Sequence, residues 1–68
     1  MSVARVTEIS STSPTGFEEA IRKGIERANQ TLRGVEGAWI KEQTVAIKDG
    51  RIESYKVNML ITFVLEGT

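Results

Sequence analysis

The sequence contains neither cysteine nor histidine among its 68 residues. Without cysteine, the chain can form no disulfide and no thiolate metal site. Because histidine is missing too, zinc, haem and copper lose their usual ligands, and Ser-His-Asp or Cys-His catalysis cannot be assembled. The remaining serines and threonines have no base to activate them, so we expect a protein that is not an enzyme.

An excess of charge of one sign is also missing. Nine lysine and arginine residues balance nine acidic residues, and the pI is near 6.2. Such a chain has no long-range field to attract nucleic acid or an acidic membrane. No apolar run approaches the roughly 18 residues of a membrane span, and the N-terminus lacks the basic-then-apolar order of a signal peptide. We expect a cytoplasmic protein with no nucleic-acid or membrane partner.

The short chain limits the size of the hydrophobic core. A domain of this length buries only about 60% of the surface that its unfolded chain exposes. Below roughly 70 to 80 residues, one core seldom supplies more than about 3–5 kcal/mol, and disulfides, a metal or partner chains provide the rest. Partner chains are the route left open here. We therefore expect one domain over residues 1–68 that assembles with copies of itself.

The first half of the chain is predicted to hold one strand and one helix. β-Branched residues dominate Val3–Ile9, which favours an extended segment at the edge of a sheet. A hydroxyl-rich segment around the only proline follows, and in it Thr15 precedes Glu18 in capping-box spacing, so the helix is predicted to begin there. Arg33 is expected in its last turn, and Gly34 is expected to end it in the left-handed conformation.

Apolar residues recur along this helix at a spacing of 3.6, which predicts one buried stripe. Gly24 lies inside the stripe, where glycine costs about 1 kcal/mol relative to alanine. That cost is sensible only if another backbone passes very close, either in the sheet or in a partner chain. The stripe consists of Phe17, Ala20, Ile21, Gly24, Ile25, Ala28 and Leu32.

The second half of the chain is predicted to be a β-hairpin. Asp49-Gly50 lies between two extended runs and favours a two-residue type I′ turn, since both central positions need positive φ. Ala38–Lys48 is the expected first strand, and residues 54–65 alternate apolar and polar side chains without a break. The order strand, helix, strand, strand predicts an α+β fold, β-α-β-β, with a three-stranded antiparallel sheet.

The turn also predicts the strand register, provided that no bulge intervenes. Counting back from the turn places Trp39 opposite Leu60 and Gln43 opposite Lys56 on one sheet face. The unbroken apolar row that includes Val57 lies on the other face, where the helix must pack. Trp39 is therefore expected to point away from the helix. The uncovered face is expected to hold Trp39, Leu60, Val64, Ile52, Lys41, Gln43, Lys56, Asn58 and Thr62, with Lys41 opposite Asn58.

Trp39 is the residue with the most functional information, because it is the only tryptophan. Two interpretations are open. It can be an anchor at a protein interface, where tryptophan is enriched, or a platform on which a planar ring stacks. Lys56, Gln43 and Asn58 have the polar groups to orient such a ligand, although residues of this kind on a strand are commonly solvated.

The segments TSPTGFEEAI, ANQTLR and TFVLEG, with Trp39 early in the second strand, resemble the dodecins over nearly the whole chain. The resemblance implies a three-stranded antiparallel sheet wrapped around one helix and a hollow homododecamer. It also implies that a flavin, such as riboflavin or flavin mononucleotide (FMN), stacks on Trp39 at subunit interfaces. The site residues expected on this basis are Trp39, Lys56 and Gln43.

The sequence departs from the dodecin pattern after Tyr55. Flavin-binding dodecins typically carry a glutamine there, whose amide both donates to and accepts from the flavin edge, whereas this chain has Lys56. An ammonium group only donates, so Gln43 is the expected source of the missing acceptor. The departure motivates an alternative function, in which a dodecin-like shell binds no flavin and acts as a scaffold or binds ions through carboxylates gathered at symmetry axes.

Overall fold

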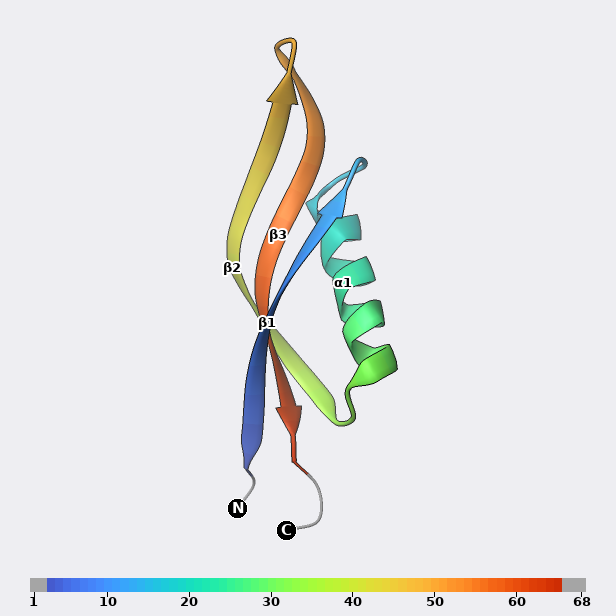
Figure 1. Cartoon of the computed structure of the whole chain (residues 1–68), viewed down its shortest axis with the longest axis vertical. Helices are drawn as coiled ribbons and strands as arrows, with labels where there is room; N and C mark the ends of the chain where they lie inside the picture. Colours follow the sequence, from blue (N-terminus) through green and yellow to red (C-terminus); the bar gives the residue numbers. More distant parts are fainter. Residues whose placement is uncertain (1–2, 66–68) are drawn as a thin grey trace.

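The computed structural model describes residues 3–65 and contains three strands and one helix in this part of the chain. Their order is β1 (Ala4–Ser13), α1 (Phe17–Thr31), β2 (Val35–Lys48) and β3 (Arg51–Val64), which confirms the predicted β-α-β-β arrangement. The strands form one antiparallel sheet in the order β1-β3-β2 (Figure 1). β1 is an edge strand, as expected.

The core lies between α1 and one face of the central strand β3. Val57, Met59 and Ile61 have no exposed surface, which confirms the alternation predicted for this strand. Ala20, Gly24 and Ala28 are buried on the facing side of α1. Around them pack Ile9, Phe17, Ile21, Ile25, Leu32, Val35 and Ile40.

Gly24 permits the closest contact between helix and sheet. A Cβ atom added there would lie 2.9 Å from the Met59 methyl carbon and 3.1 Å from the Ser11 Cβ. The sheet therefore approaches α1 closely at Gly24, although through the side chains of Met59 and Ser11 and not through the backbone that was predicted. At the other end of α1, Gly34 has φ of 72°, as predicted, and an added Cβ would lie 2.9 Å from the backbone oxygen of Val64.

Several predicted boundaries were wrong because strand pairing extends beyond the local pattern. β1 continues past Ile9 to Ser13, which pairs with Tyr55, and β2 begins at Val35, which pairs with Phe63. The helix begins after Gly16 without a side-chain cap. The Thr15 hydroxyl donates to the Glu19 carboxylate and not to Glu18. Arg33 lies beyond the helix, which ends at Thr31.

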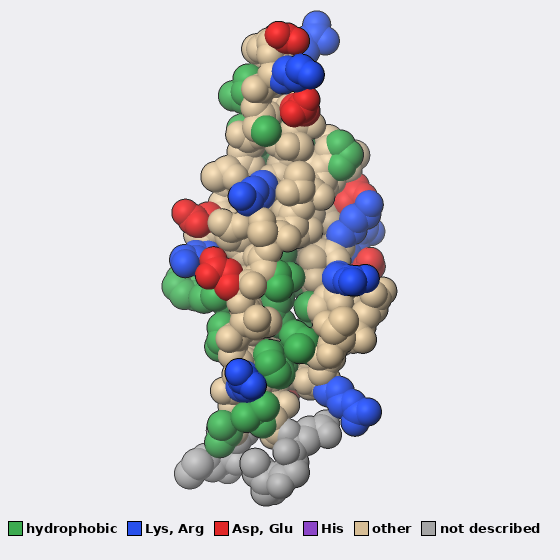
Figure 2. Space-filling view, viewed as in Figure 1, with side chains coloured by type: hydrophobic (Ala, Val, Ile, Leu, Met, Phe, Trp, Pro, Cys, Tyr) green, Lys and Arg blue, Asp and Glu red, His purple; other side chains and the backbone are tan. Residues whose placement is uncertain are grey.

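The β2–β3 hairpin projects past the helix, so one helix covers only part of the sheet (Figure 1). The turn has φ of 53° at Asp49 and 75° at Gly50, with Lys48 paired to Arg51, which confirms the predicted turn. The molecule extends 53 Å along its longest axis but only 13 Å along its shortest. Apolar side chains gather in the lower half of Figure 2, while charged ones border the helix and the hairpin tip. Within residues 3–65, no helix is long and apolar enough to span a membrane.

Candidate ligand-binding face of the sheet

The face of the sheet opposite α1, here called the outer face, carries Trp39. Trp39 pairs with Leu60 on β3, and Leu60 pairs with Glu8 on β1, so these side chains form one row across the three strands. The adjacent Ile40 packs against the core on the helix side. Trp39 itself is 63% exposed. The prediction that it points away from the helix is confirmed.

A β-bulge follows Ile40 and gives the row of Trp39 a polar border. Because Ile40 pairs with Met59 and Glu42 pairs with Asn58, Lys41 is the extra residue of β2. The Asn58 amide nitrogen donates to a Glu42 carboxylate oxygen at 3.1 Å. The Lys41 ammonium lies 3.6 Å from the Glu8 carboxylate, across β3. These polar side chains therefore lie beside Trp39 on the outer face.

A further bulge near the turn, where Glu53 is the extra residue of β3, makes part of the predicted register wrong. Thr44, and not Gln43, stands opposite Lys56, whereas Gln43 pairs with the buried Val57 and so belongs to the helix-side face. Lys41 does not oppose Asn58, because Glu42 takes that place. The structure thus brings Lys56 and Asn58 to the face of Trp39 but places Gln43 on the other face.

A row of donors next to this border was missed from the sequence. Thr12 on β1 and Thr44 on β2 both pair with Lys56, and all three side chains are exposed. Opposed Cβ atoms in such pairs lie about 4.5–5.5 Å apart. Within residues 3–65 the structure gives none of the three a side-chain hydrogen bond or an ion pair. The sequence pattern did not predict this row, because the pairing of Thr44 with Lys56 depends on the bulges.

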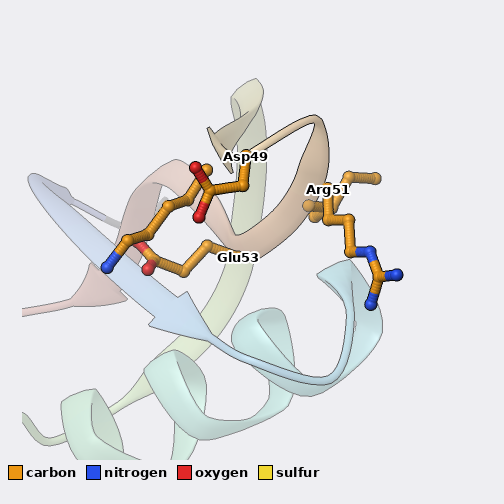
Figure 3. A pocket seen from close by; sticks show the side chains of 5 residues that line it. Asp49, Arg51 and Glu53 are labelled. Carbon is orange, nitrogen blue, oxygen red and sulfur yellow. The ribbon is translucent and has the colours of Figure 1, made fainter.

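The hairpin tip lies away from Trp39 and differs from it in chemistry. Ile52 pairs with Ile47, as the turn predicts, but the bulge at Glu53 places this pair on the face that continues from Val45 and Tyr55. The prediction of Ile52 on the outer face was therefore wrong. A hollow of about 510 Å³ at the tip is bordered by charges of both signs, with Asp49 and Glu53 on one side and Arg51 on the other (Figure 3). It offers no aromatic surface for a ring.

The described residues contain no ready-made cation site. No group of three or more acidic side chains converges within residues 3–65. On the outer face, Glu8 and Glu42 are already engaged by Lys41 and Asn58. The pKa of Glu19 is lowered, first by the hydrogen bond from Thr15 and then by Lys23, but this carboxylate lies on α1 and not on the outer face.

Comparison with known proteins places this fold and its exposed tryptophan in a family. The family model of the dodecins matches residues 3–66. The chain belongs to the dodecin family. Dodecins are small, non-enzymatic binding proteins whose members bind flavins, and they are typically homo-oligomeric. The resemblance noted in the sequence is thereby confirmed.

Relatives of this dodecin include solved structures and a curated protein. The dodecin from Streptomyces davaonensis is 39% identical, with 97% of each chain covered and a TM-score of 0.92. The dodecin from Streptomyces coelicolor is 34% identical, with 98% of this chain and 96% of that chain covered and a TM-score of 0.91. Calcium dodecin from Mycobacterium tuberculosis is 30% identical over 63 residues, which is 93% of this chain and 89% of that protein.

Proposed function

We propose that this dodecin binds and stores a flavin, stacked on Trp39 at interfaces of a homododecameric shell. The observation that carries the proposal is the 63% exposure of Trp39 on a face that no element within residues 3–65 covers. An exposed aromatic surface with Leu60 beside it suits a planar ring, and aromatic stacking contributes about 0.5–1.5 kcal/mol beyond the burial of area. The polar border gives such a ring an orientation.

In this proposal Lys56 donates a hydrogen bond to a carbonyl oxygen of the flavin. Lys56 lies four residues from Leu60 along β3, a distance of about 13 Å at ~3.3 Å per residue. A three-ring ligand on Trp39 and an extended lysine side chain cover this distance together. Gln43 has no part in the proposed site, because it lies on the helix-side face of its own chain.

Self-assembly belongs to the same proposal, because one chain covers only one side of a stacked ring. The core of the described chain consists of five buried hydrophobic residues, a small number for an independent monomer. Val6 and Trp39 on the outer face, and Ile47 and Ile52 at the hairpin, expose large apolar surface that copies of the chain would bury. A second copy would bring a second Trp39 and a second flavin, so that two stacked flavins lie between the two tryptophans.

Titration of the apo-protein with riboflavin tests the proposal, with tryptophan and flavin fluorescence and light scattering recorded on the same samples. We expect mutual quenching that saturates near one flavin per chain, from a particle close to twelve chains in mass. Trp39→Ala should abolish the quenching and leave the particle mass unchanged. Quenching that persists in Trp39→Ala, or none in the wild type, would overturn the proposal.

A second candidate function is ion binding by the shell without flavin. The relative named calcium dodecin favours it, and Lys56 in place of glutamine is compatible with it. Since no acidic cluster lies within residues 3–65 of one chain, the carboxylates would have to come from several copies. This alternative predicts no flavin quenching and a melting temperature that rises with added Ca²⁺, because a ligand of the folded state stabilises it. An unchanged melting temperature at millimolar Ca²⁺ would remove it.

A further inference from the structure

The proposed contact with Lys56 leaves one polar group of the ligand without a hydrogen-bond partner. The pyrimidine edge of an oxidised flavin presents a ring N–H between two carbonyl groups. The ammonium of Lys56 can donate to a carbonyl but cannot accept from the N–H. A donor that loses its water on binding and finds no acceptor costs about 1–3 kcal/mol. A tightly bound flavin therefore needs an acceptor close to Lys56.

We propose that Thr44 supplies this acceptor and is a specificity-determining residue of the site. Its hydroxyl accepts from the ring N–H while Lys56 donates to the neighbouring carbonyl, so two side chains from adjacent strands replace one amide. Two observations carry the proposal. Thr44 stands opposite Lys56 on the neighbouring strand, and within residues 3–65 neither side chain has a hydrogen-bond partner. It rests on the proposed function, because it requires a flavin on the outer face.

Thr44 is the better placed of the two threonines that flank Lys56. Thr44 lies on β2, the same strand as Trp39, so a ring stacked on Trp39 and directed at Lys56 passes over it. Thr12 has the same chemistry and also pairs with Lys56, but it lies on β1, on the far side of β3. Glu42 is closer to the row of Trp39, but it stands opposite Asn58 and not opposite Lys56; because its carboxylate can accept more than the one bond from Asn58, it is the competing acceptor in the test.

The test compares riboflavin with its N3-methyl derivative, which lacks the N–H, by fluorescence quenching. The wild type should bind riboflavin about tenfold more tightly than the methylated compound, the effect of one lost hydrogen bond and an unsatisfied acceptor. Thr44→Val keeps the side-chain shape and removes the hydroxyl. It should weaken riboflavin binding by about tenfold and abolish the preference. Thr12→Val is the matched control and should behave as the wild type.

A double variant separates a direct contact between Thr44 and the flavin from a general disturbance of the strand. In Lys56→Gln, the new amide has both a donor and an acceptor, so adding Thr44→Val should change riboflavin affinity less than about twofold. An unchanged preference in Thr44→Val, or a loss of preference in Thr12→Val or in Glu42→Leu, which has no acceptor, would overturn the role of Thr44. A wild type that quenches neither compound would instead overturn the proposed function itself.

Discussion

The two faces of strand β3 alternate residue by residue along one segment, yet they differ in what covers them. Toward α1, Val57, Met59 and Ile61 have no exposed surface. On the outer face, Leu60 is half-buried and the neighbouring Trp39 is 63% exposed. One face therefore supplies the stability of the fold, while the other remains free for a ligand or a partner chain.

Alanine substitutions at neighbouring positions of β3 give the largest contrast between the faces. Ile61→Ala should lower the free energy of unfolding by about 3 kcal/mol, because it removes packed methyl groups and leaves a cavity under α1. Leu60→Ala, on the outer face, should cost about 1 kcal/mol or less. Urea unfolding at one fixed protein concentration measures both values. Equal losses would show that the outer face is as tightly packed as the inner one.

A pair of glycine substitutions tests where the backbone between α1 and β2 tolerates a side chain. Gly34→Ala should cost about 2 kcal/mol, since φ of 72° strains a side chain and its Cβ would meet the Val64 oxygen at 2.9 Å. Gly37→Ala is the matched control, because an added Cβ has no neighbour within 4 Å there. It should be neutral or slightly stabilising. Thermal unfolding of the two variants side by side decides the point, and a stable Gly34→Ala would contradict the strain.

Removing Trp39 tests whether the outer face contributes to stability at all. If Trp39 is a platform for a ligand, Trp39→Ala should change the unfolding free energy of the apo-protein by less than about 0.5 kcal/mol. If Trp39 instead anchors an interface without a ligand, the loss should exceed about 2 kcal/mol and the particle should dissociate on dilution. Urea unfolding and light scattering over a range of concentrations distinguish the two interpretations.

The smallest effect is expected at Glu19, on the solvent side of α1. The hydrogen bond from Thr15 and the ammonium of Lys23 lower its pKa from an ordinary value of 4.5. Its ionised form therefore stabilises the fold above that ordinary pKa, and the contribution is lost as the pH falls through the lowered pKa. The stability difference between wild type and Glu19→Gln should shrink between about pH 5 and pH 3. A difference independent of pH would contradict the assignment.

Local chemistry was sufficient to predict much of the fold. Asp49-Gly50 predicted the turn because few residues tolerate positive φ there, and the alternation along β3 predicted the buried face. Gly24 predicted a close approach because only such a contact explains glycine inside a helix stripe. The predicted capping box at Thr15 failed because Gly16 is the N-cap residue and no side chain caps the helix, while the Thr15 hydroxyl donates to Glu19.

The candidate site was predicted only in part, and the two bulges between the turn and Trp39 explain why. The extra residues of these bulges, Glu53 in β3 and Lys41 in β2, cancel at Trp39, so its predicted pairing with Leu60 survived. Gln43 lies between the two bulges of β2 and β3, where the register is shifted by one residue, and its assignment to the outer face failed. Because side chains alternate with a period of two, one extra residue moves a side chain to the other face.

Sequence patterns were enough to predict the order of the elements, the hairpin turn, the helix stripe and the outward direction of Trp39. These depend on neighbouring residues and on the period of the apolar pattern. The tertiary structure alone decided that Thr44 stands beside Lys56, that β1 continues to Ser13 and that Ile52 faces the helix side. These depend on bulges and on pairing between strands that are distant in the sequence, and a local residue pattern specifies neither.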